Sequence, residues 1–297
     1  MDAVTHRAGV FGKPIGHSLS PVIHNAGYVA AGLAGWRYTA HECGEDELSD
    51  RLAMLDSTWA GLSLTMPLKQ VALTLADEVS PLAATVGAAN TLYRRAGRWI
   101  AENTDAPGMV DVLRQSGVTG AGRVTVLGAG GTARAAIAAA ARLGTAEVVV
   151  YARRREAIER LSPVAGELGV RLVPADWSTA PERAGQADVL ISTVPSGVAD
   201  ALVPDLSVRG DLTVFDVLYQ PWPTPLAAAC LAAGCTVVGG LELLLAQAAR
   251  QFELFTGVPV PASAICEAAC AAATFRTADD RRTVHRDGSV DGMWSGS

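Results

Sequence analysis

Val124-Thr-Val-Leu-Gly128-Ala-Gly130-Gly131-Thr-Ala133 runs from a short apolar strand, through glycines, into an alanine-rich helix. Glycine suits such a turn because a bound pyrophosphate leaves no room for a Cβ, while the helix start offers amide donors and positive potential. An ordinary tight turn is the alternative. The next strand, Glu147–Tyr151, follows at the spacing of a dinucleotide-binding βαβ unit. This spacing favours a cofactor site built from Gly128, Ala129, Gly130, Gly131, Thr132 and Ala133.

The end of the second strand distinguishes between the two nicotinamide dinucleotides. An NAD site usually has Asp or Glu there to accept a hydrogen bond from the ribose 2′-hydroxyl, but this chain reads Tyr151-Ala152-Arg153-Arg154-Arg155. Because guanidinium groups match a 2′-phosphate in a bidentate manner, the sequence predicts NADP as the cofactor. A solvated helix start is the alternative. It is weakened because three cations oppose the positive end of the helix dipole unless an anion offsets them.

Strands alternate with helices on both sides of this unit, which predicts an α/β fold with mainly parallel sheets covered by helices. Six strands of the second half fit a doubly wound sheet: Arg123–Leu127, Glu147–Tyr151, Val170–Val173, Val189–Thr193, Thr213–Val217 and Thr236–Val238. In the first half, strands Ala8–Gly12, Trp36–His41 and Gly61–Thr65 alternate with helices Pro21–Ala31, Glu45–Leu55 and Leu68–Glu78.

The length of 297 residues accommodates two domains. We expect an N-terminal α/β substrate domain with a mainly parallel sheet over residues 1–106 and a Rossmann NADP-binding domain over residues 107–240. The glycine-rich stretch 117–122 reads as the linker into the second block. Helices are predicted over residues 241–273, including the long helix Leu241–Phe255, and the polar segment 274–297 is predicted to be a disordered tail.

Composition excludes several classes of protein. The sequence has no apolar run near the roughly 20 residues needed to cross a bilayer and no export or transit signal in residues 1–7, so we expect a cytoplasmic protein. A net charge of −6 argues against nucleic-acid binding. The five cysteines lack metal-site spacing and are interpreted as small core residues, with no disulfide and no metal site: Cys43, Cys230, Cys235, Cys266 and Cys270.

A lysine follows the third strand. Gly61-Leu-Ser-Leu-Thr65-Met-Pro67-Leu-Lys69 is predicted to pass from strand to helix, with Pro67 in the first helical turn. There the helix dipole disfavours a cation, so Lys69 is a candidate acid or base. An exposed helix lysine is the alternative.

A hairpin brings two further polar residues to Lys69. Short strands flank Arg95-Ala96-Gly97-Arg98, which predicts that Asn90 and Asp105 lie close together at the open end of the hairpin. Asp105 also precedes the predicted helix Pro107–Gln115, so an N-cap is its structural alternative.

Gly16-His17-Ser18-Leu-Ser20-Pro21 places two hydroxyl groups on one side of an extended segment. Ser20 could equally be the N-cap of the helix that begins at Pro21. His17 lies beside a glycine turn and His24 inside the helix, so both are interpreted as structural or supporting residues.

Together these motifs resemble the shikimate dehydrogenases over nearly the whole chain, except the tail after about Thr274. The N-terminal substrate loop is matched by Gly12–Asn25, the catalytic segments by Leu64–Lys69, Gly87–Thr91 and Asn103–Gly108, and the phosphate loop by Gly128–Arg134. Asp216-Val-Leu-Tyr219 with Thr224-Pro-Leu226 is similar to the strand that lines the cleft, and Gly240–Ala248 completes the set.

The resemblance implies NADP-dependent, reversible reduction of 3-dehydroshikimate to shikimate in aromatic amino-acid biosynthesis, by a monomer or homodimer. Lys69 and Asp105 would be the catalytic pair that handles the proton during hydride transfer. The implied substrate-binding residues are Ser18, Ser20, Thr65, Lys69, Asn90, Asp105, Tyr219 and Gln247. For the cofactor, the resemblance adds Ala152, Arg153, Arg154, Thr193, Val217 and Gly240 to the glycine loop. It also implies that the C-terminal helices over residues 241–273 return to the substrate domain, which would bring Gln247 to the substrate.

Three positions depart from the pattern of the family. Ala152-Arg153-Arg154 replaces its usual Asn-Arg-Thr, Leu243 stands where Met is frequent, and Ser192-Thr-Val-Pro-Ser-Gly197 replaces an Asn-containing version. Two alternatives therefore stay open. One is a quinate/shikimate or aminoshikimate dehydrogenase of the same superfamily, and the other is a non-catalytic sensor of NADP or a hydroxy acid, which would be expected to lack Lys69 or Asp105.

Overall fold

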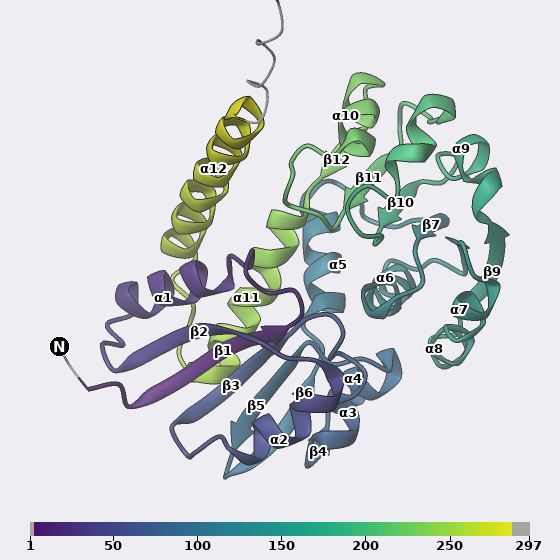
Figure 1. Ribbon diagram of the computed structural model, residues 1–297. Helices are drawn as coiled ribbons and strands as arrows, with labels where there is room; N and C mark the ends of the chain where they lie inside the picture. The colour runs from purple at the N-terminus through teal and green to yellow at the C-terminus, as the bar shows by residue number, and fades with distance from the viewer. Residues whose placement is uncertain (1–2, 287–297) are drawn as a thin grey trace, which may run out of the picture.

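Two six-stranded sheets form the body of the protein, and two helices join them (Figure 1). The computed structural model describes residues 3–286, with side chains described as far as residue 274. Each sheet has its own helices, and α5 (Asp105–Gln115) and α11 (Gly240–Thr256) lie between the two halves. The expected two-domain α/β fold is confirmed.

The first sheet has the order β2-β1-β3-β5-β6-β4. Pairing is parallel except on both sides of β5, where β3–β5 and β5–β6 are antiparallel. The strands are β1 (His6–Gly12), β2 (Trp36–Glu42), β3 (Trp59–Leu64), β4 (Glu78–Val79), β5 (Thr91–Arg95) and β6 (Arg98–Glu102). The predicted hairpin is therefore present, with Ala96 and Gly97 both at positive φ in its turn.

The second sheet is parallel throughout and has the order β12-β11-β10-β7-β8-β9. This is the doubly wound order of dinucleotide-binding domains, in which ligands bind where the strand order reverses, here between β7 and β10. The strands are β7 (Arg123–Leu127), β8 (Glu147–Ala152), β9 (Arg171–Asp176), β10 (Val189–Ser192), β11 (Thr213–Asp216) and β12 (Thr236–Val238). All six predicted strands are found.

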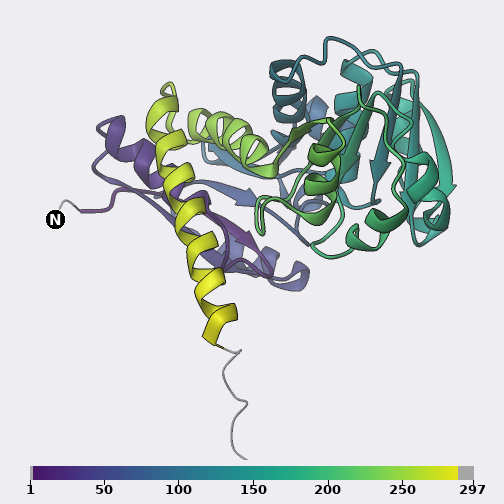
Figure 2. The same cartoon turned by 90° about the horizontal axis from the view of Figure 1, so that it is seen from above.

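Helices cover the sheets and bridge the two halves. The remaining ones are α1 (Ser20–Ala30), η1 (Glu45–Glu47), α2 (Leu48–Ala53), α3 (Ala72–Leu75), α4 (Pro81–Val86), α6 (Gly131–Arg142), α7 (Arg155–Glu159), α8 (Ser162–Glu167), η2 (Trp177–Thr179), α9 (Ala180–Arg183), η3 (Asp200–Asp205), α10 (Pro225–Ala232) and α12 (Ala262–Arg286). Figure 2 shows α12 lying across α1 and projecting beyond the first sheet. The helix after Gly240 does return to the first half, where α11 packs against β3, β5 and α1.

The predicted helix Leu68–Glu78 is wrong. Residues 66–71 form turns, α3 spans one turn only, and Glu78–Val79 pairs with Ile100–Ala101 as an edge strand. Ser80 then caps α4 by accepting a hydrogen bond from the amide of Ala83 at 3.0 Å. Sheet pairing and this new cap outweigh the helical propensity of the segment.

Two other expectations need correction. The segment predicted to be a disordered tail is helical over residues 274–286, because α12 continues to Arg286 without a glycine or proline, while residues 287–297 lie outside the described part. Cys43, Cys230 and Cys235 are buried as expected, but Cys266 and Cys270 lie on the exposed side of α12.

A continuous apolar core crosses from one half to the other through α5. Met109 and Leu113 of α5 belong to the same cluster as Val86 of α4 and Ile137 of α6. Within residues 3–286, no helix is long and apolar enough to cross a membrane, and no cluster of histidine, cysteine and acidic side chains could hold a metal ion.

Candidate active site

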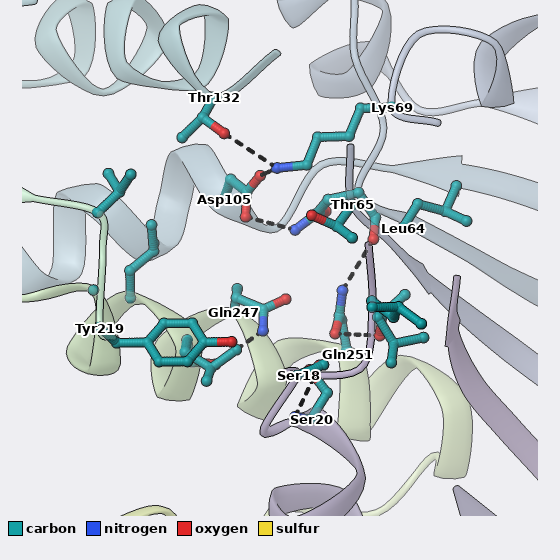
Figure 3. A pocket seen from close by; sticks show the side chains of 18 of the residues that line it. Ser18, Ser20, Leu64, Thr65, Lys69, Asp105, Thr132, Tyr219, Gln247 and Gln251 are labelled. Carbon is teal, nitrogen blue, oxygen red and sulfur yellow. Dashed lines mark hydrogen bonds and ion pairs between the residues drawn. The ribbon is translucent and has the colours of Figure 1, made fainter. Parts of the chain in front are cut away.

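A cleft of about 350 Å³ lies between the two sheets, beside α11 and the start of α6 (Figure 3). Every residue that the sequence assigned to the substrate contributes to its lining, although these residues come from segments as distant as Ser18 and Gln247. The lining comprises Val10, Pro14, Ile15, His17, Ser18, Ser20, Ser63, Leu64, Thr65, Lys69, Asn90, Asp105, Thr132, Val217, Tyr219, Gly240, Leu243, Leu244, Gln247 and Gln251.

Lys69 projects into this cleft from the turns that follow β3, rather than from a helix, so the helix-dipole argument does not apply to it. Its carbonyl accepts a hydrogen bond from the amide of Ala89 at 2.7 Å, which fixes the turn beside Asn90. The Nζ atom lies 2.7 Å from Oδ2 of Asp105 and 3.4 Å from Oγ1 of Thr132. Lys69 thus forms a partly buried ion pair and also reaches the first turn of α6 (Figure 3).

Asp105 is held from both sides. Its Oδ2 accepts the hydrogen bond from Lys69, and its Oδ1 accepts one of 2.8 Å from Nδ2 of Asn90. Asp105 is the first residue of α5 and does not cap it; Asn103 Oδ1 instead accepts a hydrogen bond from the amide of Ala106 at 3.0 Å. Both carboxylate oxygens are therefore directed into the cluster of polar residues in the cleft.

The hydroxyl and amide side chains opposite this cluster come from the start of α1 and the residues before it, from α11 and from the loop after β11. Ser20 is the first residue of α1 rather than its N-cap, and its amide donates to Ser18 Oγ at 3.2 Å. Gln247 is buried on α11 and donates to the carbonyl of Leu244 at 2.9 Å. Tyr219 donates to the carbonyl of His17 at 3.5 Å. These groups converge on the cleft from the side opposite Lys69 (Figure 3).

The two candidate histidines differ in position. His17 lines the cleft, although the sequence suggested only a structural or supporting role for it. His24 is buried and stacks on Tyr38 with ring centroids 4.2 Å apart. Burial lowers the pKa of His24 to about 3, so its imidazole is neutral at neutral pH.

The glycine loop lies beside Lys69, whose Nζ atom is 3.4 Å from Oγ1 of Thr132. Gly128 has a φ of +103°, and a Cβ there would lie 2.6 Å from Oγ1 of Thr193, so the turn requires glycine. No atom lies within 4 Å of the position of a Cβ on Gly130, the N-cap of α6, so the surface is open there. Ala133 is completely buried at the packing position. The loop therefore presents open space and helix amides at the strand-order reversal.

The arginine cluster extends away from this loop. Arg153, Arg154 and Arg155 are exposed at the junction of β8 and α7, beside half-buried Ala152. Arg155 pairs with Glu159 at 3.3 Å, whereas no salt bridge within the described residues involves Arg153 or Arg154. Two cations thus remain available to an anion.

Two chain segments meet closely where α11 begins. A Cβ on Gly240 would lie 2.0 Å from the carbonyl oxygen of Val217, so only glycine allows α11 to start against this loop. Asp216 Oδ2 accepts a hydrogen bond of 2.7 Å from Thr224, which ties the two ends of the loop that carries Tyr219. Burial raises the pKa of the Asp216 carboxyl.

Sequence reasoning missed Gln251 and Ser63, which are buried polar residues of the cleft. Gln251 lies four residues after Gln247 on α11, and this spacing places both glutamines on one face of the helix. That spacing was the available signal for Gln251.

Three family models match most of the chain. Residues 10–92 match the model of the shikimate dehydrogenase substrate binding domain, residues 240–270 that of the shikimate 5′-dehydrogenase C-terminal domain, and residues 100–210 that of the alanine dehydrogenase/PNT C-terminal domain. Shikimate dehydrogenase (NADP(+)) of Dinoroseobacter shibae is 36% identical over 261 residues, which cover 84% of this chain and 92% of that protein.

Solved structures extend the likeness to three dimensions. Mycobacterium tuberculosis shikimate dehydrogenase has a TM-score of 0.80 and 41% identity, covering 90% of this chain and 99% of that one. Shikimate 5-dehydrogenase of Thermus thermophilus, in complex with NADP(H) and shikimate, has a TM-score of 0.77 and 33% identity with the same coverage. Since sequence identity above 30% extends over most of both chains and both halves of the fold agree, this chain belongs to the shikimate dehydrogenase family.

Proposed function

We propose that this chain catalyses the NADP-dependent interconversion of shikimate and 3-dehydroshikimate. The observation that carries the proposal is the cluster of Lys69, Asp105 and Asn90, which lies within reach of Thr132 on the phosphate-loop helix. A secondary alcohol bound against Lys69 would therefore lie between the proton-handling pair and the cofactor loop. That juxtaposition is what reversible alcohol oxidation requires.

The Lys69–Asp105 pair handles the proton in this proposal. Oxidation of the alcohol releases a hydride to the cofactor and a proton from the hydroxyl, and reduction of the ketone requires both in return. In the reduction, the ammonium of Lys69, held by Asp105 at 2.7 Å, would donate a proton to the ketone oxygen and become a neutral amine. In the oxidation, the neutral amine would accept the proton of the hydroxyl. The partial burial of the pair strengthens this interaction and limits the access of water.

The other cleft residues match the remaining polar groups of a small polyhydroxylated carboxylate. We assign Ser18, Ser20 and Tyr219 to the carboxylate end, because they lie together at one side of the cleft. Thr65, Asn90 and Gln247 are assigned to ring hydroxyls, together with Lys69 and Asp105.

The chain also fits NADP. Gly130 leaves open space at the start of a twelve-residue helix, as a pyrophosphate needs, and exposed Arg153 and Arg154 suit a 2′-phosphate. Thr193, Val217 and Gly240 would border the nicotinamide, which supplies and accepts the hydride when bound. Residues 1–106 would form the substrate domain and residues 107–240 the cofactor domain.

Relatives that act on quinate or aminoshikimate remain the second candidate. The arginines of residues 153–155, with no acid after Tyr151, favour NADP and the biosynthetic reaction over them. A non-catalytic sensor is disfavoured because Lys69 and Asp105 are both present and paired. We further expect a cytoplasmic enzyme that is monomeric or homodimeric, which light scattering after size exclusion would resolve.

The test is NADP reduction followed by absorbance, with shikimate and with quinate, each repeated with NAD. We expect strong activity with shikimate and NADP only. A preference for quinate or NAD would assign the chain to the second candidate, and inactivity with every pair would contradict the proposal.

A further inference from the structure

Gln251 joins the returning helix α11 to the first sheet through three hydrogen bonds. Its side chain is completely buried. Its Oε1 accepts a bond of 2.6 Å from Ser63 Oγ on β3, while its Nε2 donates to Thr91 Oγ1 at 2.9 Å and to the carbonyl of Asn90 at 3.1 Å. One side chain of α11 therefore touches both strands that lead into the cleft.

Backbone partners fix the orientation of this amide. The carbonyl of Asn90 can only accept, so Nε2 of Gln251 must face it and Oε1 must face Ser63. Thr91 Oγ1 then accepts from Gln251 and has its own proton free to donate. Its neighbour at 3.0 Å is Oδ1 of Asn90.

The same reasoning orients Asn90. Its Oδ1 accepts from the amide of Thr104 at 2.7 Å, which can only donate, and from the hydroxyl of Thr91. The NH₂ group must therefore face Asp105, whose Oδ1 lies 2.8 Å away. A directed chain runs from Gln251 through Thr91 and Asn90 to Asp105, the partner of Lys69.

We propose that Thr91 and Gln251 are positioning residues that link the placement of α11 to the orientation of Asn90 and Asp105. The inference rests on the proposed dehydrogenase function of this cleft. Thr91 itself is completely buried and, unlike Gln251, does not line the cleft. Because α11 also carries Gln247, one helix sets both a substrate contact and the catalytic carboxylate.

The decisive variant is Thr91→Val, which keeps the shape of the side chain and removes its hydroxyl. Since one hydrogen bond to the Asn90 amide is lost, we expect kcat/KM for shikimate to fall by about threefold to tenfold. The fall should include a raised KM for shikimate with an unchanged KM for NADP. Thr91→Ser, which restores the hydroxyl, should return both constants to within about twofold of the unmodified protein.

Thr125→Val is the matched control, since Thr125 is a buried threonine on β7 of the other sheet. A loss of folded protein would lower kcat in both variants without raising the KM for shikimate. Gln251→Leu should raise the same KM, and combining it with Thr91→Val should give less than the product of the two separate effects, because both act through one chain.

Equal kinetics for Thr91→Val and Thr125→Val, or a full multiplicative effect in the double variant, would overturn the proposal while leaving the dehydrogenase function intact. Failure of the dehydrogenase function would instead appear as inactivity of the unmodified protein. In that case crystal structures would test the positioning role of Thr91. The Asn90–Asp105 hydrogen bond should persist in the unmodified protein and lengthen in Thr91→Val, and its persistence in the variant would contradict the positioning role.

Discussion

The proposed substrate cleft and the proposed adenosine site differ in how their polar groups are satisfied before a ligand binds. In the proposed substrate cleft, Asp105 is already bonded to both Lys69 and Asn90, and the three side chains are largely buried. At the adenosine end, Arg153 and Arg154 are exposed, and Gly130 faces open space. The first end is preorganised for chemistry, whereas the second contributes binding energy only when an anion arrives. Changes at the two ends should therefore affect different kinetic constants.

The largest effect should come from removing the ammonium at the preorganised end. Lys69→Ala is expected to lower kcat by about a thousandfold with a modest change in KM, because the group that handles the proton is lost. Stopped-flow and steady-state absorbance would measure it. Arg37→Ala is the control, since Arg37 is an exposed cation on β2 that does not line the cleft. If the Lys69→Ala variant kept most of its turnover, Lys69 would not be the group that handles the proton.

Gly130→Ala tests the proposed pyrophosphate site at the start of α6 without disturbing the fold. The added methyl meets no protein atom within 4 Å, and the backbone φ of −92° accepts alanine, so stability should be unchanged. If a pyrophosphate lies against this position, the affinity for NADP should fall by about tenfold to a hundredfold, as calorimetry would report. Gly166→Ala, at an equally open position in α8, is the matched control. Unchanged affinity in Gly130→Ala would place the pyrophosphate elsewhere.

Acid should destabilise the protein through His24, a buried histidine of α1. The pKa of His24 is lowered by burial from 6.5 to about 3, so between these values the unfolded chain binds a proton that the folded chain does not. The contribution of His24 to the free energy of unfolding is complete above pH 6.5 and decreases as the pH falls. At pH 5 the decrease should be about 2 kcal/mol. Urea unfolding at pH 7 and pH 5 would measure the loss.

The corresponding variant is His24→Phe, which keeps an aromatic ring on Tyr38 and removes the titrating group. Its loss of stability between pH 7 and pH 5 should be smaller than that of the unmodified protein by the same amount. His6→Phe is the control, because His6 also stacks on an aromatic ring, that of Trp36, but is exposed. An equal acid loss in all three proteins would exclude His24 as the cause.

The same contrast explains what could be predicted from sequence. The second sheet was predictable because its strands are short apolar runs separated by regular helices, and the glycine loop carries a local signature. Asn90 and Asp105 were placed together because the hairpin signal around Gly97 is local too. The helix expected at Lys69 failed because Glu78–Val79 pairs with a strand some twenty residues away, a non-local contact that periodicity does not register.

Gln251 shows which part of the site could not be predicted from the sequence. Its spacing from Gln247 indicates a shared helix face, but nothing local says that this face meets β3 and β5. That contact depends on α11 crossing from one half to the other, and the crossing in turn requires Gly240 to start against the carbonyl of Val217. The crossing of α11 could be predicted from the family resemblance, whereas the hydrogen bonds of Gln251 are seen only in the structure.

The smallest effect should come from a single arginine at the adenosine end. Arg153→Ala removes one exposed guanidinium, so we expect KM for NADP to rise by about tenfold or less, with kcat unchanged. KM for NAD should not change, because NAD has no 2′-phosphate to bind. Arg155→Ala is the matched control within the same cluster, since Arg155 pairs with Glu159. An equal rise in KM for NADP and for NAD would mean that Arg153 acts only through the overall positive potential of the cluster. The predicted contact with the 2′-phosphate would then be wrong.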